Sequence, residues 1–302
     1  MIDRLLTQLI LLSQHTPFRG RGGYSSIPAS EQAQATSLDK ARAEAADFQR
    51  FFSYFPDSSL SGQLRDRIVL DFGSGYGGRT VEYALKYGPQ MVCGVEPVQA
   101  HVEAGQSLAL ERGATQVEFR VNSQRGIPYQ DETFDIVVTF DVLEHVDDPK
   151  AMLSELRRVV KPGGQMFAVF PVYRGMFAHH LDYITLLPAL HLIFSLHRIM
   201  RVVNGLLDGP LSHIVVTRHA GAHESYCGRV VLPMLNGMGL NDFEAALGDG
   251  WKIERLQKNS VLDVLLGPQH WAAKLMRPLL RLPGFISEIF CFNVASVLRR
   301  TS

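Results

Sequence analysis

The stretch that decides the fold is Ile68-Val69-Leu70-Asp71-Phe72-Gly73-Ser74-Gly75-Tyr76-Gly77-Gly78. Its apolar run predicts a buried parallel strand, which ends in an acid and a glycine-rich turn. The next segment, Arg79 to Tyr87, predicts a helix. Such a unit is typical of a nucleotide-type pocket, because glycines let the backbone approach a ligand and the helix amino end offers unpaired N–H groups.

The glycines of this turn fit two different motifs. Gly73, Gly75 and Gly78 satisfy G-x-G-x-x-G, the dinucleotide fingerprint, and replacing the last of them by Gly77 satisfies G-x-G-x-G equally well. Asp71 favours the second motif, since its carboxylate would repel a pyrophosphate on the helix amino end and attract a cationic ligand. A dinucleotide-binding oxidoreductase using NAD stays as the alternative interpretation, although no hydride-transfer site is recognisable.

Two further blocks extend the pattern. They are Phe-Asp-Ile-Val-Val-Thr-Phe-Asp-Val-Leu-Glu-His-Val from Phe134, and Leu-Arg-Arg-Val-Val-Lys-Pro-Gly-Gly from Leu156. With the glycine turn, they stand in the order and at the spacing of class I S-adenosylmethionine-dependent methyltransferases, which the chain resembles from about Arg67 to Pro171. The end of the second block, Lys161 to Gly164, predicts a helix stop and a turn before a strand at Gln165 to Phe170.

The resemblance implies an α/β fold of defined architecture: a Rossmann-like parallel sheet closed by an antiparallel strand pair, with helices on both faces and helical lid insertions. It divides the chain into four segments: an N-terminal helical cap at 1–65, a cofactor-binding core at 66–171, a helical substrate lid at 172–240, and closing strands with a helical insertion at 241–302. The second and third strands are expected at Met91 to Val95 and at Val117 to Val121. The last two are expected at Trp251 to Leu256 and at Ile289 to Leu298, the latter for its β-branched and aromatic residues.

The resemblance also implies S-adenosylmethionine as cofactor and assigns its contacts to nine residues: Asp71, Gly73, Ser74, Gly75, Gly77, Glu96, Ser123, Phe140 and Asp141. Asp71 and the glycine turn would hold the methionine and ribose part. Glu96 would accept from both ribose hydroxyls, because a carboxylate has two acceptor oxygens and no donor. Ser123 stands where the family often has an acid for the adenine amino group, and Phe140 with Asp141 would lie beside the reactive end.

Five histidines are candidates for contact with the methyl acceptor: His145, His179, His180, His219 and His223. His145 follows the expected methyl position, and histidine titrates near neutral pH. A solvated Glu144–His145 pair at a helix start is the alternative for this position. His179-His180-x-Asp182 has the spacing of metal ligands, but no second carboxylate or cysteine cluster completes a site, so no metal is expected. Packed or exposed histidines without a catalytic role are the alternative for the others.

Two segments of the insertions are amphipathic and basic. The first has Leu196, Met200, Val203 and Leu207 at helical spacing, with Arg198 and Arg201 on other faces. The second has Trp271, Leu275, Met276 and Leu279 beside Lys274, Arg277 and Arg281, and Pro278 is expected to kink it. Such segments are either buried helices of a lid or helices that lie on an anionic membrane. Their apolar character predicts a hydrophobic or lipid-linked acceptor. Ile184 to Leu196 is also apolar, but it is too short to span a bilayer.

Composition limits the partners. The 302 residues carry 30 Lys and Arg against 30 Asp and Glu, so the charge gives no reason to expect nucleic acid. Cys93, Cys227 and Cys291 are scattered, which predicts reduced thiols, no zinc site and a cytoplasmic protein. The start, Met1 to Leu12, has Asp3 and Arg4 and is a poor signal peptide. Peripheral membrane contact and the oligomeric state stay open.

The sequence therefore predicts an S-adenosylmethionine-dependent methyltransferase that methylates oxygen or carbon of a small, hydrophobic or lipid-linked acceptor. In such a reaction the protein aligns the acceptor with the methyl group and excludes water. A general base is needed when a hydroxyl, phenol or carbon acceptor must lose a proton. The alternatives are the NAD-dependent oxidoreductase and a protein that binds S-adenosylmethionine without transferring its methyl group.

Overall fold

The computed structural model describes residues 1–16, 35–55, 60–123, 126–181, 184–212, 235–266 and 269–301. The chain divides into two compact units. Unit 1 consists of Met1–Gln34, Pro171–Gly237 and Asn259–Phe292, and unit 2 consists of Ala35–Phe170, Met238–Lys258 and Asn293–Ser302. This division cuts across the four segments expected from the sequence, because each unit consists of three stretches that are separated along the chain.

Unit 2 contains a seven-stranded sheet, apart from the last two residues of β6 and the first two of β7. Its order is β3-β2-β1-β4-β5-β7-β6; the first five of these strands are parallel and β7 is antiparallel to β5. The strands are β1 Ile68–Phe72, β2 Met91–Glu96, β3 Val117–Val121, β4 Phe134–Phe140, β5 Val160–Phe170, β6 Trp251–Ser260 and β7 Cys291–Arg300. The predicted Rossmann-like α/β fold is confirmed.

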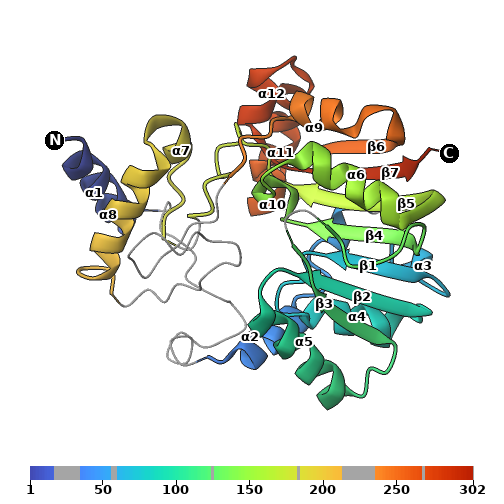
Figure 1. Ribbon diagram of the computed structural model, residues 1–302. Helices are drawn as coiled ribbons and strands as arrows, with labels where there is room; N and C mark the ends of the chain where they lie inside the picture. Colours follow the sequence, from blue (N-terminus) through green and yellow to red (C-terminus); the bar gives the residue numbers. More distant parts are fainter. Residues whose placement is uncertain are drawn as a thin grey trace. The chain divides into compact units, whose positions relative to one another are not determined.

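Helices surround the sheet, and Figure 1 shows α4, α5 and α6 running alongside it. The helices of unit 2 are α2 Ser37–Ala46, η1 Phe52–Tyr54, α3 Leu60–Gln63, α4 Gly78–Tyr87, α5 Gln99–Arg112, η2 Leu143–His145, α6 Pro149–Val159, α9 Leu240–Leu247 and η3 Gly248–Gly250. Gly88 and Gly113 end α4 and α5 in the left-handed conformation that glycine adopts at little cost. Cys93 and Cys291 are buried in β2 and β7, as the sequence predicts, and Cys227 lies outside the described residues.

The turn predicted at Lys161 to Gly164 differs in detail from the structure. Strand β5 begins at Val160, which pairs with Phe134, and the next paired residues are Gln165 and Ile136. The four residues between them form an irregularity within the strand, with Gly163 at φ +74°. The block therefore bends the strand instead of preceding it.

Unit 1 is helical. It contains α1 Ile2–Ser13, α7 Leu190–Ile193, α8 Leu196–Leu207, α10 Val261–Leu266, α11 Trp271–Met276, η4 Arg277–Arg281 and α12 Phe285–Ile289. The predicted stripe of α8 is buried at Met200, Val203 and Leu207, in a cluster that also contains Leu6 and Ile10 of α1. The buried interpretation of this segment is thus confirmed. Among the described residues, no helix has the length and apolar character that crossing a membrane requires.

The second amphipathic segment does not kink at Pro278. Helix α11 ends at Met276, and Pro278 lies in the first turn of η4, where its missing N–H costs nothing. The segment is therefore a short α-helix followed by a 3₁₀ helix.

Candidate functional site

The carboxyl ends of β1, β2 and β4 lie at one edge of the sheet of unit 2, because these strands are parallel. Asp71, next to the last residue of β1, is fully buried. Its Oδ2 accepts a hydrogen bond of 2.7 Å from the Thr80 hydroxyl, and its Oδ1 has no hydrogen-bond partner among the described residues. Burial raises the pKa of Asp71, although Arg79 and the Thr80 hydrogen bond act to lower it. The edge thus holds a buried carboxyl group with one oxygen unsatisfied.

The glycine turn follows directly. Gly73 has φ +76°, and a Cβ atom there would lie 2.3 Å from Cγ2 of Val142. Both the backbone conformation and the lack of space therefore require glycine at this position. The backbone N–H groups of Gly73 and Ser74 both donate to the carbonyl oxygen of Val95 in β2, each at 3.0 Å. These bonds fix the turn against the neighbouring strand. The Ser74 hydroxyl is buried, with no partner among the described residues.

Glu96 ends β2 and is 3% exposed. Its Oε2 accepts from the N–H of Gly75 at 3.2 Å, so the predicted ribose-binding acid lies against the predicted glycine turn. Its Oε1 lies 3.4 Å from Nδ1 of His101 and makes no hydrogen bond within the described part of the chain. The His101 ring packs on Tyr76, with ring centroids 3.9 Å apart. His101 lies in the first turn of α5, the helix that follows Glu96, and no sequence motif marks it.

Arg79, also missed by the sequence reasoning, adds a cation to this edge. Its Nη2 donates to the carbonyl oxygen of Gly73 at 3.3 Å, and its guanidinium lies 5.3 Å from the ring centre of Phe51 and 5.9 Å from that of Phe140. These two rings stack at 4.9 Å. Burial acts to lower the pKa of Arg79, but the acidic groups around it, Asp71 foremost and then Tyr83, Glu44 and Asp141, together outweigh burial and raise it. Arg79 therefore stays charged and offsets part of the negative charge around Asp71.

Glu44 of α2 occupies the amino end of α4. Its two carboxylate oxygens accept from the N–H groups of Tyr76, at 3.2 Å, and Gly78, at 3.3 Å. Burial raises the pKa of Glu44 to about 7, although Arg79 and both N–H groups act to lower it. A carboxyl group at this helix end takes the place that a dinucleotide pyrophosphate needs. This carboxyl group therefore disfavours the NAD interpretation. The sequence analysis missed Glu44 because it lies about thirty residues before the glycine motif.

Ser123 and Asn122 follow β3. Ser123 is exposed and forms an isolated bridge with Gly126. The N–H of Asn122 donates to the carbonyl oxygen of Glu96 at 3.3 Å, and its side-chain Oδ1 is buried with no partner among the described residues. Asn122 is thus a second candidate acceptor for an adenine amino group. Its place directly after a predicted strand is a signal that the sequence reasoning did not use.

The end of β4 brings acidic groups together. Asp141 has φ +56°, and its N–H donates to the carbonyl oxygen of Val169 at 2.8 Å. Glu144 is 3% exposed, so it is not the solvated residue of the alternative interpretation. Its Oε1 lies 3.5 Å from Nε2 of His145. Burial, with a smaller contribution from the Asp141 carboxylate, raises the pKa of Glu144 well above its usual range. Glu144 is therefore a buried carboxyl group with a raised pKa, beside a partly exposed histidine.

Two other candidate histidines, His179 and His180, belong to unit 1. His179, in unit 1, is buried, with Nε2 3.0 Å from the carbonyl oxygen of Leu187 and Nδ1 accepting from the N–H of Leu181. Burial and the nearby His191 lower the pKa of His179 to about 4. Both ring nitrogens are engaged by backbone, so this histidine has a structural role. His180 lies beside it at φ +53°, and His219 and His223 lie outside the described residues.

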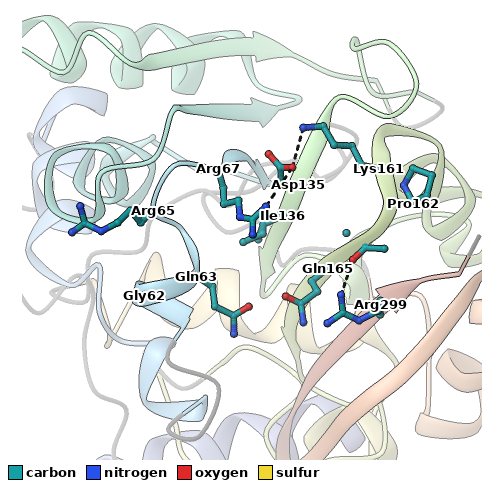
Figure 2. Close-up of a pocket in the computed structure, with 12 residues that line it drawn as sticks. Gly62, Gln63, Arg65, Arg67, Asp135, Ile136, Lys161, Pro162, Gln165 and Arg299 are labelled. Atoms are coloured by element: carbon teal, nitrogen blue, oxygen red, sulfur yellow. Dashed lines mark hydrogen bonds and ion pairs between the residues drawn. The ribbon is translucent and has the colours of Figure 1, made fainter.

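A separate cavity of about 300 Å³ lies at the amino ends of β1 and β4 (Figure 2). Asp135 lines it, accepting from the N–H of Ile68 and from Nζ of Lys161, both at 2.9 Å. Arg299, on the same lining, forms an ion pair with Glu254. These pairs join strands at the end of the sheet opposite to the glycine turn, which is a structural role.

Comparison with known proteins identifies the central segment. Residues 70–168 match the family model described as a methyltransferase domain. This segment of the chain is similar to a methyltransferase domain. The match contains β1 from Leu70 onward, the glycine turn, Glu96, and Asp141 with Glu144 and His145, so the edge described above belongs to this domain.

Curated relatives and solved structures agree with this assignment. Norajmaline N-methyltransferase of Rauvolfia serpentina is 31% identical over 163 residues, which are 54% of this chain and 52% of that protein. A ubiquinone biosynthesis O-methyltransferase of Leptothrix cholodnii is 35% identical over 107 residues, 35% of this chain and 45% of that protein. The chain spans about half the length of these relatives. A methyltransferase structure from Mesorhizobium loti has a TM-score of 0.50 at 14% identity, covers 84% of this chain and 98% of its own, and shows the same fold.

S-adenosylmethionine is the cofactor of this class of domain, and the residues of the edge fit it. The buried polar atoms that lack a hydrogen-bond partner among the described residues include four oxygens of this edge: Oδ1 of Asp71, Oγ of Ser74, Oε1 of Glu96 and Oδ1 of Asn122. The cofactor offers an amino acid ammonium group, two ribose hydroxyls and an adenine amine, which are the donors that such acceptors need. The individual contacts stay predictions.

Proposed function

We propose that the protein transfers the methyl group of S-adenosylmethionine to oxygen or carbon of a small hydrophobic acceptor. The main support for this proposal is a pair of buried carboxyl groups, Asp71 and Glu96, within the segment that matches the methyltransferase domain. Each has one oxygen that lacks a hydrogen-bond partner among the described residues. A buried acceptor without a partner costs folding free energy. Retaining two of them at one edge is consistent with a ligand that satisfies both.

The cofactor supplies a methyl group that is already activated on a positive sulfur. Glu96 would hold the ribose, and Asp71 with the glycine turn would hold the amino acid part. The Phe51 and Phe140 rings would keep water from this edge. His145 is the proposed base for an acceptor that must lose a proton, because histidine side chains ordinarily titrate near neutral pH. Glu144 lies beside it, with its Oε1 3.5 Å from Nε2 of His145.

The acceptor class follows from the apolar side chains of unit 1 and from the relatives. Methylation of nitrogen and of oxygen both occur in the names of the relatives, and one of those names refers to ubiquinone biosynthesis. Ubiquinone is a lipid-soluble quinone. These names support a hydrophobic acceptor, and a phenolic hydroxyl combines oxygen as acceptor atom with the need for a base such as His145.

The test is transfer of radiolabelled methyl from S-adenosylmethionine into an extract of the source cells, separated into organic-soluble, aqueous and macromolecular fractions. The proposal predicts label in the organic fraction and its loss in Glu96→Ala. Label confined to the aqueous fraction would replace the hydrophobic acceptor by a polar metabolite. Absence of label from every fraction, with cofactor binding retained, would favour a protein that binds S-adenosylmethionine without transferring its methyl group.

A further inference from the structure

The segment from α11 to α12 exposes large apolar side chains in close succession. In α11, Trp271 and Leu275 are each 69% exposed. They are four residues apart and therefore lie on one face of the helix. Ala273, on another face, is fully buried and anchors the helix to unit 1. The exposed face of α11 thus carries two of the side chains that proteins most often bury.

Three more exposed apolar side chains follow: Leu282 at 39%, Phe285 at 51% and Ile286 at 49%. Helix α11 contacts η4, and η4 contacts α12; four of the five residues lie on α11 and α12, and Leu282 directly follows η4. We call Trp271, Leu275, Leu282, Phe285 and Ile286 the apolar surface. Single exposed apolar residues are ordinary, but a group of five within sixteen residues of sequence indicates a partner.

The charges of this segment have one sign. From Leu266 to Ile286 the sequence contains Lys274, Arg277 and Arg281 and neither Asp nor Glu. All three basic residues are exposed. Arg277 pairs with Asp263 at 3.0 Å, whereas Lys274 and Arg281 have no acidic partner within the described ranges. The apolar surface is therefore interleaved with uncompensated positive charge.

We propose that the apolar surface docks on an anionic membrane. Tryptophan, phenylalanine and leucine bury into the boundary between headgroups and acyl chains, and nearby lysine and arginine are attracted by anionic headgroups. A second copy of the chain is a poorer occupant, because a symmetric contact would bring Lys274 and Arg281 of each copy towards the same positive segment of the other. The membrane supplies both the apolar phase and the negative charge that this surface lacks.

The proposal goes beyond methyl transfer and is measured without either substrate. The full chain is sedimented with vesicles of phosphatidylcholine alone and with vesicles that also contain phosphatidylglycerol. The protein is expected to bind the anionic vesicles more tightly and to lose binding as salt is added. The double variant Trp271→Ser/Leu275→Ser is expected to bind about a hundredfold more weakly, roughly tenfold for each large apolar group lost.

Leu110→Ser is the matched control, because Leu110 is 85% exposed on α5 in unit 2. It should bind vesicles like the unaltered protein. The charge variant Lys274→Glu/Arg281→Glu is expected to weaken binding to anionic vesicles about tenfold or more. Its control is Lys150→Glu, which reverses an exposed charge of unit 2 and should leave binding to anionic vesicles unchanged. All four variants alter exposed side chains, and equal thermal midpoints would show that each folds.

Two outcomes would overturn the proposal. One is equal binding to both kinds of vesicle, or unchanged binding by Trp271→Ser/Leu275→Ser. The other is a concentration-dependent dimer in ultracentrifugation that this double variant abolishes while no form of the protein binds vesicles. That second result would assign the apolar surface to contact between copies of the chain. Neither outcome bears on whether the methyltransferase domain transfers methyl groups.

Discussion

The two compact units leave different kinds of group unsatisfied. Of the sixteen large apolar side chains that are exposed among the described residues, twelve belong to unit 1, although unit 2 has more described residues. Unit 2 buries most of its apolar side chains around the sheet. At one edge of that sheet, several buried polar atoms have no hydrogen-bond partner among the described residues. Unsatisfied polar atoms suit the binding of a polar cofactor, and uncovered apolar side chains suit contact with a hydrophobic phase.

Within unit 1, the comparison repeats on a smaller scale between α8 and α11. Both carry large apolar residues and basic residues at helical spacing. Helix α8 packs its apolar stripe with α1, and Arg198 and Arg201 pair with Asp3 of that helix at 2.7 and 3.2 Å. Helix α11 exposes Trp271 and Leu275. An amphipathic pattern therefore predicts a helix with an apolar face, and the presence of a partner helix decides whether that face is buried.

The largest effect that would sharpen this contrast comes from two leucines. Leu206 of α8 is 3% exposed and Leu275 of α11 is 69% exposed. Leu206→Ala should lower the free energy of unfolding by about 2 to 5 kcal/mol, because it removes buried methyl groups and leaves a cavity. Leu275→Ala should change it by less than about 0.5 kcal/mol. Urea unfolding measures both, and similar losses in the two variants would remove the distinction between the helices.

A pH dependence distinguishes the polar edge of unit 2. Burial raises the pKa of Glu44 to about 7, above its value in an unfolded chain. The folded protein therefore binds this proton more tightly, and the corresponding stability, about 3 kcal/mol, is lost as pH rises from about 4.5 through 7. Glu44→Gln should remove this loss. Unfolding free energies at pH 5 and pH 8 test it, and parallel pH profiles of both proteins would show that Glu44 titrates normally.

Two glycines should respond with opposite signs. A Cβ atom at Gly78 would lie 2.1 Å from the carbonyl oxygen of Ala41, so Gly78→Ala should push α2 from α4 and destabilise by about 2 kcal/mol. Gly205 lies inside α8 with open space around it, so Gly205→Ala should stabilise by about 0.5 to 1 kcal/mol. Thermal midpoints are sufficient here. A stabilised Gly78→Ala would mean that α2 does not pack closely on the glycine turn.

The sequence predicted the centre of the sheet because β1, β2 and β4 are buried almost throughout and appear as apolar runs. The third strand, Val117–Val121, has the predicted bounds, and the second, Met91–Glu96, is one residue longer than predicted. The resemblance to methyltransferases assigned Asp71, the glycine turn and Glu96 to one cofactor site, and the structure brings them to the same edge because parallel strands end there. In β6 the predicted end, Leu256, is four residues short, since the polar residues that follow do not mark a strand.

The remainder depends on contacts that sequence spacing does not contain. Glu44 reaches the glycine turn from a helix some thirty residues earlier, across a contact that requires Gly78 to lack a side chain. A solvated Glu144 was the alternative interpretation of the Glu144–His145 pair, but the residue is buried and its pKa is raised. The joining of residues 259–292 with α1 in unit 1 is a long-range association between segments that carry no shared motif. Such features arise from tertiary packing and become visible only in the folded chain.

The polar edge of unit 2 is the proposed cofactor site, and calorimetric titration of S-adenosylmethionine tests this placement most directly. Glu96→Ala should weaken binding about a hundredfold, because it removes the carboxylate proposed to accept both ribose hydroxyls. Glu103→Ala, an exposed acid on α5 bonded to Gln99, should leave the affinity unchanged. Equal affinities for all three proteins would contradict the placement of the cofactor at this edge.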